Sequence, residues 1–528
     1  MLTLTNFQER FQKSFFDKDP ILPVITVAAA ATLIYSTCKF ISYKQPQKQN
    51  TALKEIPSPK CGYPYIGHMW SFGPLPGKTI SEWHRDLGPI IKLKMGVRTW
   101  IVCDDPELAH RIFVTHGADT SYRPYTTYSN KYFSNGARGI AFSQPGKHWD
   151  KSRAAALSVL APKKIKNYLD SIHRETSDLV TRLLESTEKN GYTDPYKHNE
   201  LCFLNVVFKI AYGRSFDAID DPEFLQVIDM IETSMKFLAL EKDKPNFLPI
   251  VAIFDYFAGT QAKMKHFTDV VRNPAFTRFA EEALLRDGPN VVKSLKEDGH
   301  NLPDEDALVL LGDFITGGTD TLSVTFSWNL AIMCHHPDLQ ERVSHEIDKY
   351  IQVHGKLPTF DERTQVPLCV SVLKECMRYR PTTYFGLPHT ADRDIEVDGY
   401  ILPKGCTIIA NMDSIHKNPK HYPVHPESFL PERYMNNLKT MQAAANGKLD
   451  QRDHFNFGFG RRLCPGTYLA EVELFNAFVQ VFARCKIEPI SEDEYPNIST
   501  ARENAGLNIL PPPYKVKFIK RKDALIHV

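Results

Sequence analysis

One cysteine of this sequence lies in a loop whose composition suits chemistry. The loop reads Phe457-Gly458-Phe459-Gly460-Arg461-Arg462-Leu463-Cys464-Pro465-Gly466, and its glycines let the backbone approach a flat group closely. Apolar residues recur at helical spacing over Thr467–Ala483, so Cys464 directly precedes a predicted helix N-terminus. The dipole and the free amides of that terminus favour a thiolate. The sequence therefore predicts a ligating or reactive thiolate at Cys464.

Three interpretations of Cys464 are open on these residues. Most cysteines are structural, and Cys464 taken alone is most simply one of them. A nucleophilic thiol, as in a membrane-anchored hydrolase, needs a base, and the loop contains neither a histidine nor another placed base. A thiolate held by amide hydrogen bonds is also the ligand that pushes electron density into a haem iron. Arg462, two residues away, can then neutralise a haem propionate.

No other metal or disulfide pattern competes with this loop. The ten cysteines include no C-x-x-C pair, so neither a zinc site nor a dithiol redox motif is expected. His421, Pro423 and His425 lie in a proline-broken stretch that fits no zinc spacing.

An acid and an alcohol stand side by side in a second segment. Leu310–Ile332 is a long apolar stretch that contains Gly317 and Gly318, followed closely by Asp320 and Thr321. Two glycines lower helix stability, so in mid-helix they indicate that space is needed beside the helix. The acid and the alcohol are suited to relaying protons. A helix N-cap at this point is the alternative, but the apolar run continues on both sides.

Taken together and in chain order, these segments resemble the cytochrome P-450 family. The family's haem-loop pattern F-x-x-G-x-R-x-C-x-G is met in full from Phe457 to Gly466. The other elements follow the family's W-x-x-x-R, [AG]-G-x-[DE]-T-[TS], E-x-x-R and P-E-R-[FY] patterns, at residues 149–153, 317–322, 375–378 and 431–434. Leu322 departs from the second pattern, which puts one secondary hydrogen bond in doubt. The resemblance covers roughly residues 57–520.

The resemblance implies a role for each of these residues. Haem b would be bound with Cys464 as its axial thiolate, within a loop that includes Phe457 and Gly458. The haem propionates would be met by Trp149, Arg153, Arg462 and His389, the last from a Leu387-Pro388-His389 segment. Asp320 and Thr321 would relay protons to dioxygen. Glu375, Arg378 and Arg433 would form a structural network behind the haem.

The implied activity is a monooxygenase reaction that uses dioxygen as co-substrate. No G-x-G-x-x-G fingerprint follows a strand, so no fused reductase is expected. Electrons would come from an NADPH–haemoprotein reductase, with a small cytochrome as a further candidate donor. A basic docking face for that partner is expected near the cysteine side of the haem, made up of Lys147, Lys151, Lys163, Lys164, Lys166 and Arg461. A solvated helix face is the alternative for each lysine.

Two further functions are compatible with the same scaffold. One is an isomerase or dehydratase that needs no external electrons, and the other is a haem carrier or sensor without catalysis. The intact Asp320-Thr321 pair argues against both, since oxygen activation needs the proton relay.

The resemblance also places a substrate pocket for a lipophilic small molecule. The residues expected to line it are largely apolar and come from several segments: Tyr125, Phe314, Gly317, Phe385, Leu387 and Leu507. The sequence does not identify the substrate.

The elements that must position these residues are mostly helices. Residues 149–350 have mainly helical patterns, whereas 90–95, 99–103 and Gly386–Ile409 read as short strands and Pro106–His116 as a helix. Gly506–Lys520 is expected to form a hairpin that bends at Pro511-Pro512-Pro513. The predicted fold class is mostly α with a small β lobe, the cytochrome P-450 fold.

The N-terminal part predicts a membrane anchor. Residues 21–41 are long and apolar enough to span a bilayer, with residues 1–20 on the non-cytosolic side. A cleaved signal peptide and a buried core helix are the alternatives. Residues 42–67 are basic and proline-rich and read as a stiff linker to a haem-binding catalytic domain over 68–528. We expect a single-pass protein of the endoplasmic reticulum membrane with its catalytic domain in the cytosol. The net charge of +2 argues against nucleic-acid binding.

Overall fold

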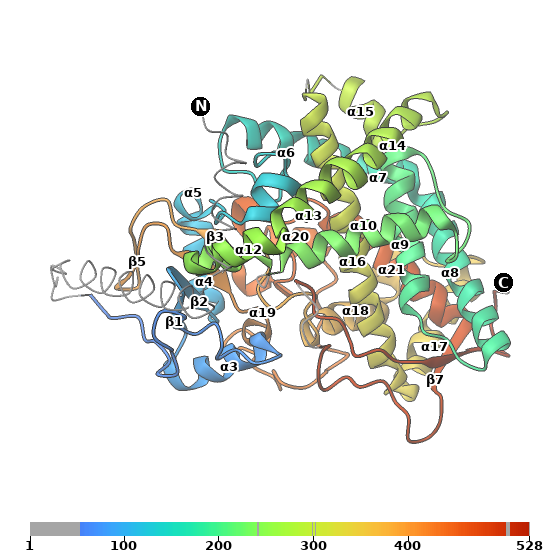
Figure 1. The fold of residues 1–528 in the computed structure, drawn as a ribbon. Coiled ribbons are helices and arrows are strands. Elements are labelled where there is room, and N and C mark those ends of the chain that lie inside the picture. Colours follow the sequence, from blue (N-terminus) through green and yellow to red (C-terminus); the bar gives the residue numbers. More distant parts are fainter. Residues whose placement is uncertain (1–52, 240–241, 298, 301, 503–506, 527–528) are drawn as a thin grey trace, which may run out of the picture.

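A helical body and a small strand-rich lobe make up the molecule (Figure 1). The computed structural model describes residues 53–239, 242–297, 299–300, 302–502 and 507–526. The expected membrane anchor at 21–41 lies outside these residues. Within them, the strands between residues 90 and 402 lie on the left of Figure 1 and most of the long helices on the right, where the later strand Cys485–Pro489 also lies.

The longest helix of the described chain, α16 (Asp304–Cys334), runs through the middle of the helical body. The apolar run predicts its central part, and three acidic residues in its first turn complement the helix dipole. No break occurs at Thr319 or Asp320, so neither is an N-cap. Its hydropathy of 1.2 over an 18-residue window would suit a membrane span, but more than half of that window is buried in the protein. It is the core helix of the fold.

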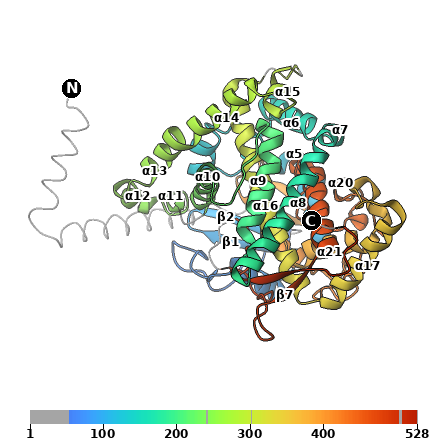
Figure 2. The same cartoon turned by 90° about the vertical axis from the view of Figure 1, so that its right-hand side faces the viewer.

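Helix α9 (Tyr196–Tyr212) lies beside α16 (Figure 2). A Cβ atom added at Gly318 would come within 2.6 Å of the Val207 side chain, so glycine at this position permits the close packing. Helix α21 (Thr467–Arg484), which the sequence predicted after the cysteine loop, also contacts α16. Buried side chains of these helices join one large hydrophobic core.

The remaining helices surround this centre. On the amino-terminal side are α3 (Pro76–Leu87), α4 (Pro106–His110), η1 (Arg111–Thr115), α5 (Gly117–Thr120), η2 (Thr127–Phe133), α6 (Lys147–Val159), α7 (Pro162–Ile165), η3 (Lys166–Tyr168) and α8 (Leu169–Asn190). The middle holds α10 (Pro222–Leu238), α11 (Lys244–Phe247), η5 (Pro249–Val251), α12 (Ala252–Ala258), α13 (Thr260–His266), η6 (Phe267–Arg272), α14 (Asn273–Leu285) and α15 (Val291–Glu297). Later come α17 (Pro337–His354), η7 (Phe360–Gln365), α18 (Pro367–Tyr379), α19 (Met412–Ile415), α20 (Met441–Ala445), η8 (Leu449–Gln451) and η9 (Gly460–Arg462). The predicted helix 106–116 is thus divided into an α and a π segment.

The main sheet joins parts of the chain that are far apart in sequence. Its order is β1-β2-β6-β3, with β1 (Ile90–Met95) antiparallel to β2 (Arg98–Cys103). β6 (Thr407–Ala410) pairs parallel to β2, and β3 (His389–Thr390) pairs antiparallel to β6. A separate pair is formed by β4 (Ile395–Val397) and β5 (Tyr400–Leu402). The sheet therefore brings the His389 segment next to the start of the domain.

The prediction of a hairpin over Gly506–Lys520 is wrong. Its last part forms β8 (Val516–Lys520), which pairs with β7 (Cys485–Pro489) directly after α21. Three successive prolines offer no amide donors, so the residues before β8 cannot form its partner strand.

The proline-rich segment 54–67 packs onto the strand lobe. The Lys54 amide donates to the Gly399 carbonyl at 2.8 Å, and the Lys92 amide donates to the Pro57 carbonyl at 2.7 Å. Gly67 bridges to Met95. This part of the predicted linker is therefore built into the catalytic body.

Candidate functional site

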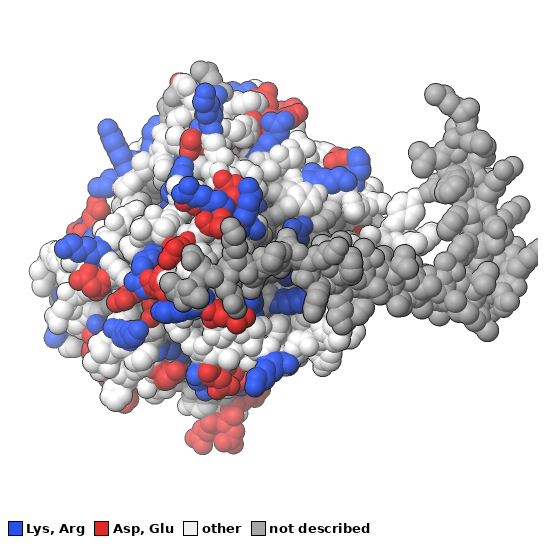
Figure 3. Space-filling view, turned by 90° about the vertical axis from the view of Figure 1, so that its left-hand side faces the viewer, with Lys and Arg blue, Asp and Glu red and all other residues white. Residues whose placement is uncertain are grey.

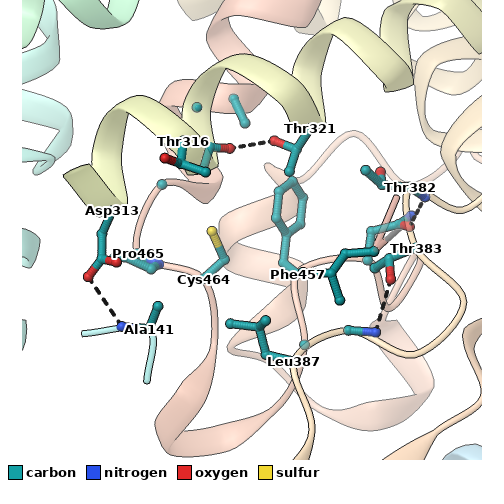
Figure 4. A pocket seen from close by; sticks show the side chains of 18 of the residues that line it. Ala141, Asp313, Thr316, Thr321, Thr382, Thr383, Leu387, Phe457, Cys464 and Pro465 are labelled. Carbon is teal, nitrogen blue, oxygen red and sulfur yellow. Dashed lines mark hydrogen bonds between the residues drawn. The ribbon is translucent and has the colours of Figure 1, made fainter. Parts of the chain in front are cut away.

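A largely apolar cavity of about 390 Å³ lies between α16 and the cysteine loop. Its volume falls within the range of about 300–1,000 Å³ that is typical of small-molecule sites. Figure 4 shows the Cys464 sulfur pointing into this space, with Thr316 and Thr321 of α16 across from it. The Cys464 side chain is exposed because it faces this cavity. The two segments that the sequence singled out therefore face each other.

The loop around Cys464 is shaped by backbone hydrogen bonds. The Cys464 amide donates to the Phe457 carbonyl at 2.9 Å, and the Thr467 hydroxyl donates to the Cys464 carbonyl at 2.8 Å. Gly460 has φ of 52°, and a Cβ atom there would come within 2.4 Å of the Phe113 carbonyl oxygen. Only glycine suits this position, because both the conformation and the space exclude a side chain.

Opposing effects act on the Cys464 thiol, and burial is the largest of them. Burial raises the pKa of the Cys464 thiol, while the Gly466 amide, the Arg153 charge and the Thr467 hydroxyl act to lower it. The sulfur also lies just before the N-terminus of α21, where the helix dipole favours negative charge. The groups that stabilise a thiolate are therefore in place.

Three arginines converge on one side of the cavity: Arg123, Arg153 and Arg462. Burial and mutual repulsion lower the pKa of Arg123 to about 9 and that of Arg462 to about 8. None of the three is ion-paired with a carboxylate within the part of the chain that the structure describes. Buried cations without counter-charge are costly, so the cluster fits a ligand that brings negative charge.

Their backbone contacts hold these arginines in position. Arg462 donates to the carbonyls of Ser121 at 2.8 Å, Ile140 at 3.1 Å and Ser143 at 2.6 Å. Arg153 donates to the Leu463 carbonyl at 2.6 Å and so ties α6 to the cysteine loop. Each guanidinium group has five N–H donors, so some stay available for a ligand.

His389 lines the same cavity, whereas Trp149 does not. The Nδ1 atom of His389 lies 2.8 Å from the Thr120 carbonyl and, as a donor to it, leaves Nε2 for the cavity. Burial, with Arg123 and Arg462, lowers the pKa of His389 well below its usual range. The Trp149 indole N–H donates to the Ile140 carbonyl at 3.2 Å, and its ring lies against Arg462 at 4.3 Å. Trp149 therefore supports the arginines from outside the cavity.

The opposite wall is one face of α16. Thr321 and Gly317 line the cavity, and the Thr321 hydroxyl donates to the Gly317 carbonyl at 2.6 Å (Figure 4). Gly317 is exposed although it lies in the middle of a core helix, and a Cβ atom there would meet nothing within 4 Å. Asp320 does not line the cavity. Its two carboxylate oxygens accept hydrogen bonds from Tyr196 and Asn508 instead.

The predicted substrate pocket is largely brought together. The apolar lining includes Phe457 and Gly458 of the loop and, of the expected pocket residues, Phe314, Gly317, Phe385, Leu387 and Leu507. Tyr125 is the exception, since it is 51% exposed and lies outside the lining. The chain that follows Tyr125 contributes Phe133, Ile140 and Phe142 to the cavity lining. An aromatic residue in a loop has no periodicity that shows which way it points.

Behind the cavity, Glu375, Arg378 and Arg433 form one buried network. Arg378 donates to both Glu375 carboxylate oxygens at 2.7 and 2.8 Å, and Arg433 Nε donates to Glu375 at 2.9 Å. Arg378 also donates to the carbonyls of His416, Pro426 and Ser428. The network thus fastens α18 to the irregular segment that leads to the cysteine loop.

Sequence reasoning missed Arg123 and Asp313. Arg123 donates to the carbonyls of Ala141, Leu387 and Pro388, all at 2.8–2.9 Å. Asp313 of α16 accepts from the amides of Ile140 and Ala141 at 2.8 and 3.3 Å (Figure 4). A single arginine in a loop gave no signal, but a carboxylate two turns before Thr321 on the cavity face of an apolar helix could have been noticed.

These residues fit a haem. Cys464 would supply the thiolate ligand, the loop glycines leave room for a flat group, and the three arginines without carboxylate partners would hold the propionates. Among the described residues no group of three metal-ligating side chains offers another metal site.

Comparisons with known proteins agree with this geometry. The family model described as cytochrome P450 matches residues 57–518. Cytochrome P450 monooxygenase 64 of Postia placenta is 26% identical over 95% of this chain and 97% of its own length. The steroid 17-alpha-hydroxylase/17,20 lyase of Felis catus is 26% identical over 84% and 87%. Cytochrome P450 2C11 of Rattus norvegicus is 27% identical over 85% and 89%. A zebra fish cytochrome P450 solved with abiraterone matches the fold with a TM-score of 0.69 at 24% identity, over 84% of this chain and all of its own.

Proposed function

The chain belongs to the cytochrome P450 monooxygenase family, and from this premise we propose that it is a membrane-anchored enzyme that hydroxylates a lipophilic small molecule. The proposal includes dioxygen as co-substrate and electrons from an NADPH-dependent reductase. The observation that carries it is the largely apolar cavity with Cys464 on one wall and Thr321 on the other.

The residues of the site divide the work between them. When bound, the haem supplies the activation of dioxygen and the insertion of one oxygen atom into the substrate. Cys464 would ligate the iron, and Arg123, Arg153, Arg462 and His389 would hold the propionates. Gly317 leaves room beside the helix, and Thr321 holds a hydroxyl at the cavity wall for proton transfer. The apolar lining excludes water and orients a lipophilic substrate.

An exposed apolar surface supports contact with a membrane. Four large side chains of α12 are 49–64% exposed: Ile253, Phe254, Tyr256 and Phe257. The Val97 amide donates to the Phe247 carbonyl at 2.8 Å, so this region adjoins the turn between β1 and β2. Exposed aromatic residues gathered at one end of a fold are typical of surfaces that meet lipid or protein. Together with an anchor at 21–41 they favour the endoplasmic reticulum membrane, with the linker joining the catalytic body near residue 54.

The charged surface is consistent with small-molecule chemistry and a protein electron donor. Figure 3 shows basic and acidic side chains interspersed over the face that it presents, without a stripe of one sign. Lys163 and Lys164 lie on α7, which packs against α21 near the cysteine loop. Lys166, which follows on η3, is paired with Asp361 at 2.8 Å. A reductase with an acidic docking surface would meet the α6–α7 side of the cysteine loop.

The test is the ferrous–carbon monoxide difference spectrum of the purified full-length protein beside Cys464→Ser. We expect a strongly red-shifted Soret band in the wild type alone. Consumption of NADPH and dioxygen with added reductase then tests monooxygenase chemistry. If the wild type lacks the shifted band, the thiolate assignment is wrong. If it shows the band but no reductase-dependent turnover, an isomerase, a dehydratase or a haem carrier is favoured instead.

A further inference from the structure

The acid and the alcohol that are adjacent in sequence have different surroundings. Thr321 lines the cavity, whereas Asp320 lies behind it and is held there by two donors. The Tyr196 hydroxyl donates to Asp320 Oδ1 at 3.2 Å, and the Asn508 side-chain amide donates to Asp320 Oδ2. Of these two partners the phenol makes a hydrogen bond that a change to phenylalanine removes without changing the ring. Asp320 is therefore held from α9 by a single donor whose effect can be tested alone.

The Tyr196 ring is fixed by packing. Tyr196 is the first residue of α9, which lies along α16. Its ring packs against a small apolar cluster that contains Val324, Trp328 and Ile509. Because the half-buried ring is held by this packing, its hydroxyl approaches Asp320 from one direction. The hydrogen bond to Asp320 is thus held by both helices.

A second acid stands next to the phenol. Glu200 follows Tyr196 at i+4, on the same face of α9, and is only 6% exposed. Burial and the nearby Asp320 charge raise the pKa of Glu200 to about 8, so that it carries a proton at pH 7. Burial, with Asp320 and Glu200, also raises the pKa of Tyr196. The exposed Glu232 of α10 adds to both effects, and the other charged groups that act on this cluster are Lys197 and Asp194.

We propose that Tyr196 positions the Asp320 carboxylate behind the oxygen-activating helix for the delivery of protons, a role that rests on the proposed function. The Tyr196 hydroxyl donates to Asp320 Oδ1 and keeps its own proton, since burial and the neighbouring acids raise its pKa. In this proton route Asp320 gives one proton toward the Thr321 side of the cavity and recovers one from solvent on the side of the exposed Glu232, so no other bond changes. Tyr196 acts through Asp320 and is a positioning residue.

The first experiment replaces Tyr196 by phenylalanine, which keeps the ring and removes the hydroxyl. The matched control is Tyr514→Phe. The Tyr514 hydroxyl also donates to α16, at the Ser327 carbonyl 2.7 Å away, but not to Asp320. Dioxygen consumption is measured in H₂O and D₂O with full-length holoprotein, reductase and NADPH, without added substrate. We expect Tyr196→Phe to slow consumption by about tenfold or more with a changed solvent isotope effect, since general-acid assistance contributes about 10²–10⁴-fold. Tyr514→Phe should match the wild type.

The second measurement needs no turnover. The infrared carbonyl band of Asp320, assigned by its loss in Asp320→Asn, is followed against pH in the resting protein. Loss of the phenol donor should shift this band in Tyr196→Phe and raise the pH at which it titrates, because a hydrogen bond to the carboxylate lowers its pKa. If Tyr196→Phe does not fold, 3-fluorotyrosine at the same position keeps ring and hydroxyl while making the phenol more acidic, and consumption should change with that acidity.

The outcomes separate this inference from the proposed function. An active wild type whose dioxygen consumption and isotope effect are unchanged in Tyr196→Phe refutes the proton route alone, as does a fluorotyrosine variant with wild-type rates. A wild type without reductase-dependent dioxygen consumption refutes the proposed function itself.

Discussion

At the scale of single residues, the site is governed by how charge is placed around a largely apolar cavity. Arg123 and Arg462 are buried and Arg153 is half-buried, all three without carboxylate partners among the described residues. Burial and neighbouring arginines lower the pKa of each. Asp313, which lines the cavity, and Asp320, which does not, have their carboxylates satisfied by donors from other segments. Thr321 holds its hydroxyl at the cavity wall through its hydrogen bond to the Gly317 carbonyl.

Removing the Thr321 hydroxyl should uncouple the reaction. We expect Thr321→Ala to consume NADPH with much less product and to release hydrogen peroxide, because the proton donor at the cavity wall is lost. The ratio of peroxide to NADPH measures the effect. Thr321→Ser keeps the hydroxyl and serves as the control. If coupling in Thr321→Ala equals that of the wild type, Thr321 has no part in proton transfer.

Asp313 should make stability depend on pH. Burial raises its pKa from 3.8 to about 6, so between these values the folded protein keeps a proton that the unfolded chain has lost. Its contribution to the free energy of unfolding is therefore greatest below pH 3.8 and falls as the pH rises toward 6. Asp313→Asn keeps an oxygen acceptor for the Ile140 and Ala141 amides and should flatten this part of the curve. Denaturant unfolding of both proteins at several pH values gives the comparison, and parallel curves would contradict it.

At the scale of elements, close packing of α16 against α9 fixes the back wall of the cavity. The two adjacent glycines of α16 serve different purposes, although the sequence treats them alike. Gly317 opens toward the cavity, and Gly318 lets Val207 of α9 approach. One glycine makes room for chemistry and the other for packing.

Substituting the two glycines should therefore have opposite effects on stability. Gly318→Ala would place a methyl group 2.6 Å from the Val207 side chain, and overpacking of this kind costs about 1–3 kcal/mol. Val207→Ala in the same chain should recover part of that loss. Gly317→Ala meets no atom within 4 Å, and the higher helix propensity of alanine should stabilise the helix by up to about 1 kcal/mol. Thermal unfolding of the three variants measures the effects, and equal losses for both glycines would contradict the assignment.

The elements themselves were largely predictable because their signals are local. The apolar run located α16, and the helical spacing after Cys464 located α21. The pairing of strands was not predictable. β7 pairs with β8 although the two strands are about 30 residues apart and no sequence pattern links them. Site residues followed the same rule: Cys464 and Thr321 stand in motifs, whereas Arg123 and Tyr196 act through contacts that only the folded chain creates.

At the scale of the whole molecule, the site lies between surfaces of different character. An exposed apolar end at α12 adjoins the strand lobe, and the helices α6 and α7 border the cysteine loop. Substrate from a membrane and electrons from a protein would thus reach the cavity from different directions.

Reversing the charges of Lys163 and Lys164 tests the electron-donor side. We expect the double Glu variant to slow reductase-driven reduction several-fold at low salt and to show a weaker dependence on ionic strength, because such steering is screened by salt. The double variant Lys520→Glu/Lys522→Glu is the control, since β8 pairs with the strand that follows the end of α21 far from the cysteine loop. Reduction by dithionite should be unchanged in all variants. Unaltered salt dependence in the double variant would remove α7 from the docking face.

The parallel pairing of β2 with β6 has a consequence for synthesis of the chain. Trp100 pairs with Thr407, so roughly 300 residues must be translated between the two strands. At about 5–20 residues per second, the second strand emerges roughly 15–60 s after the first. Throughout that interval the β1–β2 ribbon has an open edge in the nascent chain, beside whatever other chains are being made nearby. The period of greatest aggregation risk for this protein therefore falls on the ribosome, and it should lengthen when elongation is slowed between codons 104 and 406.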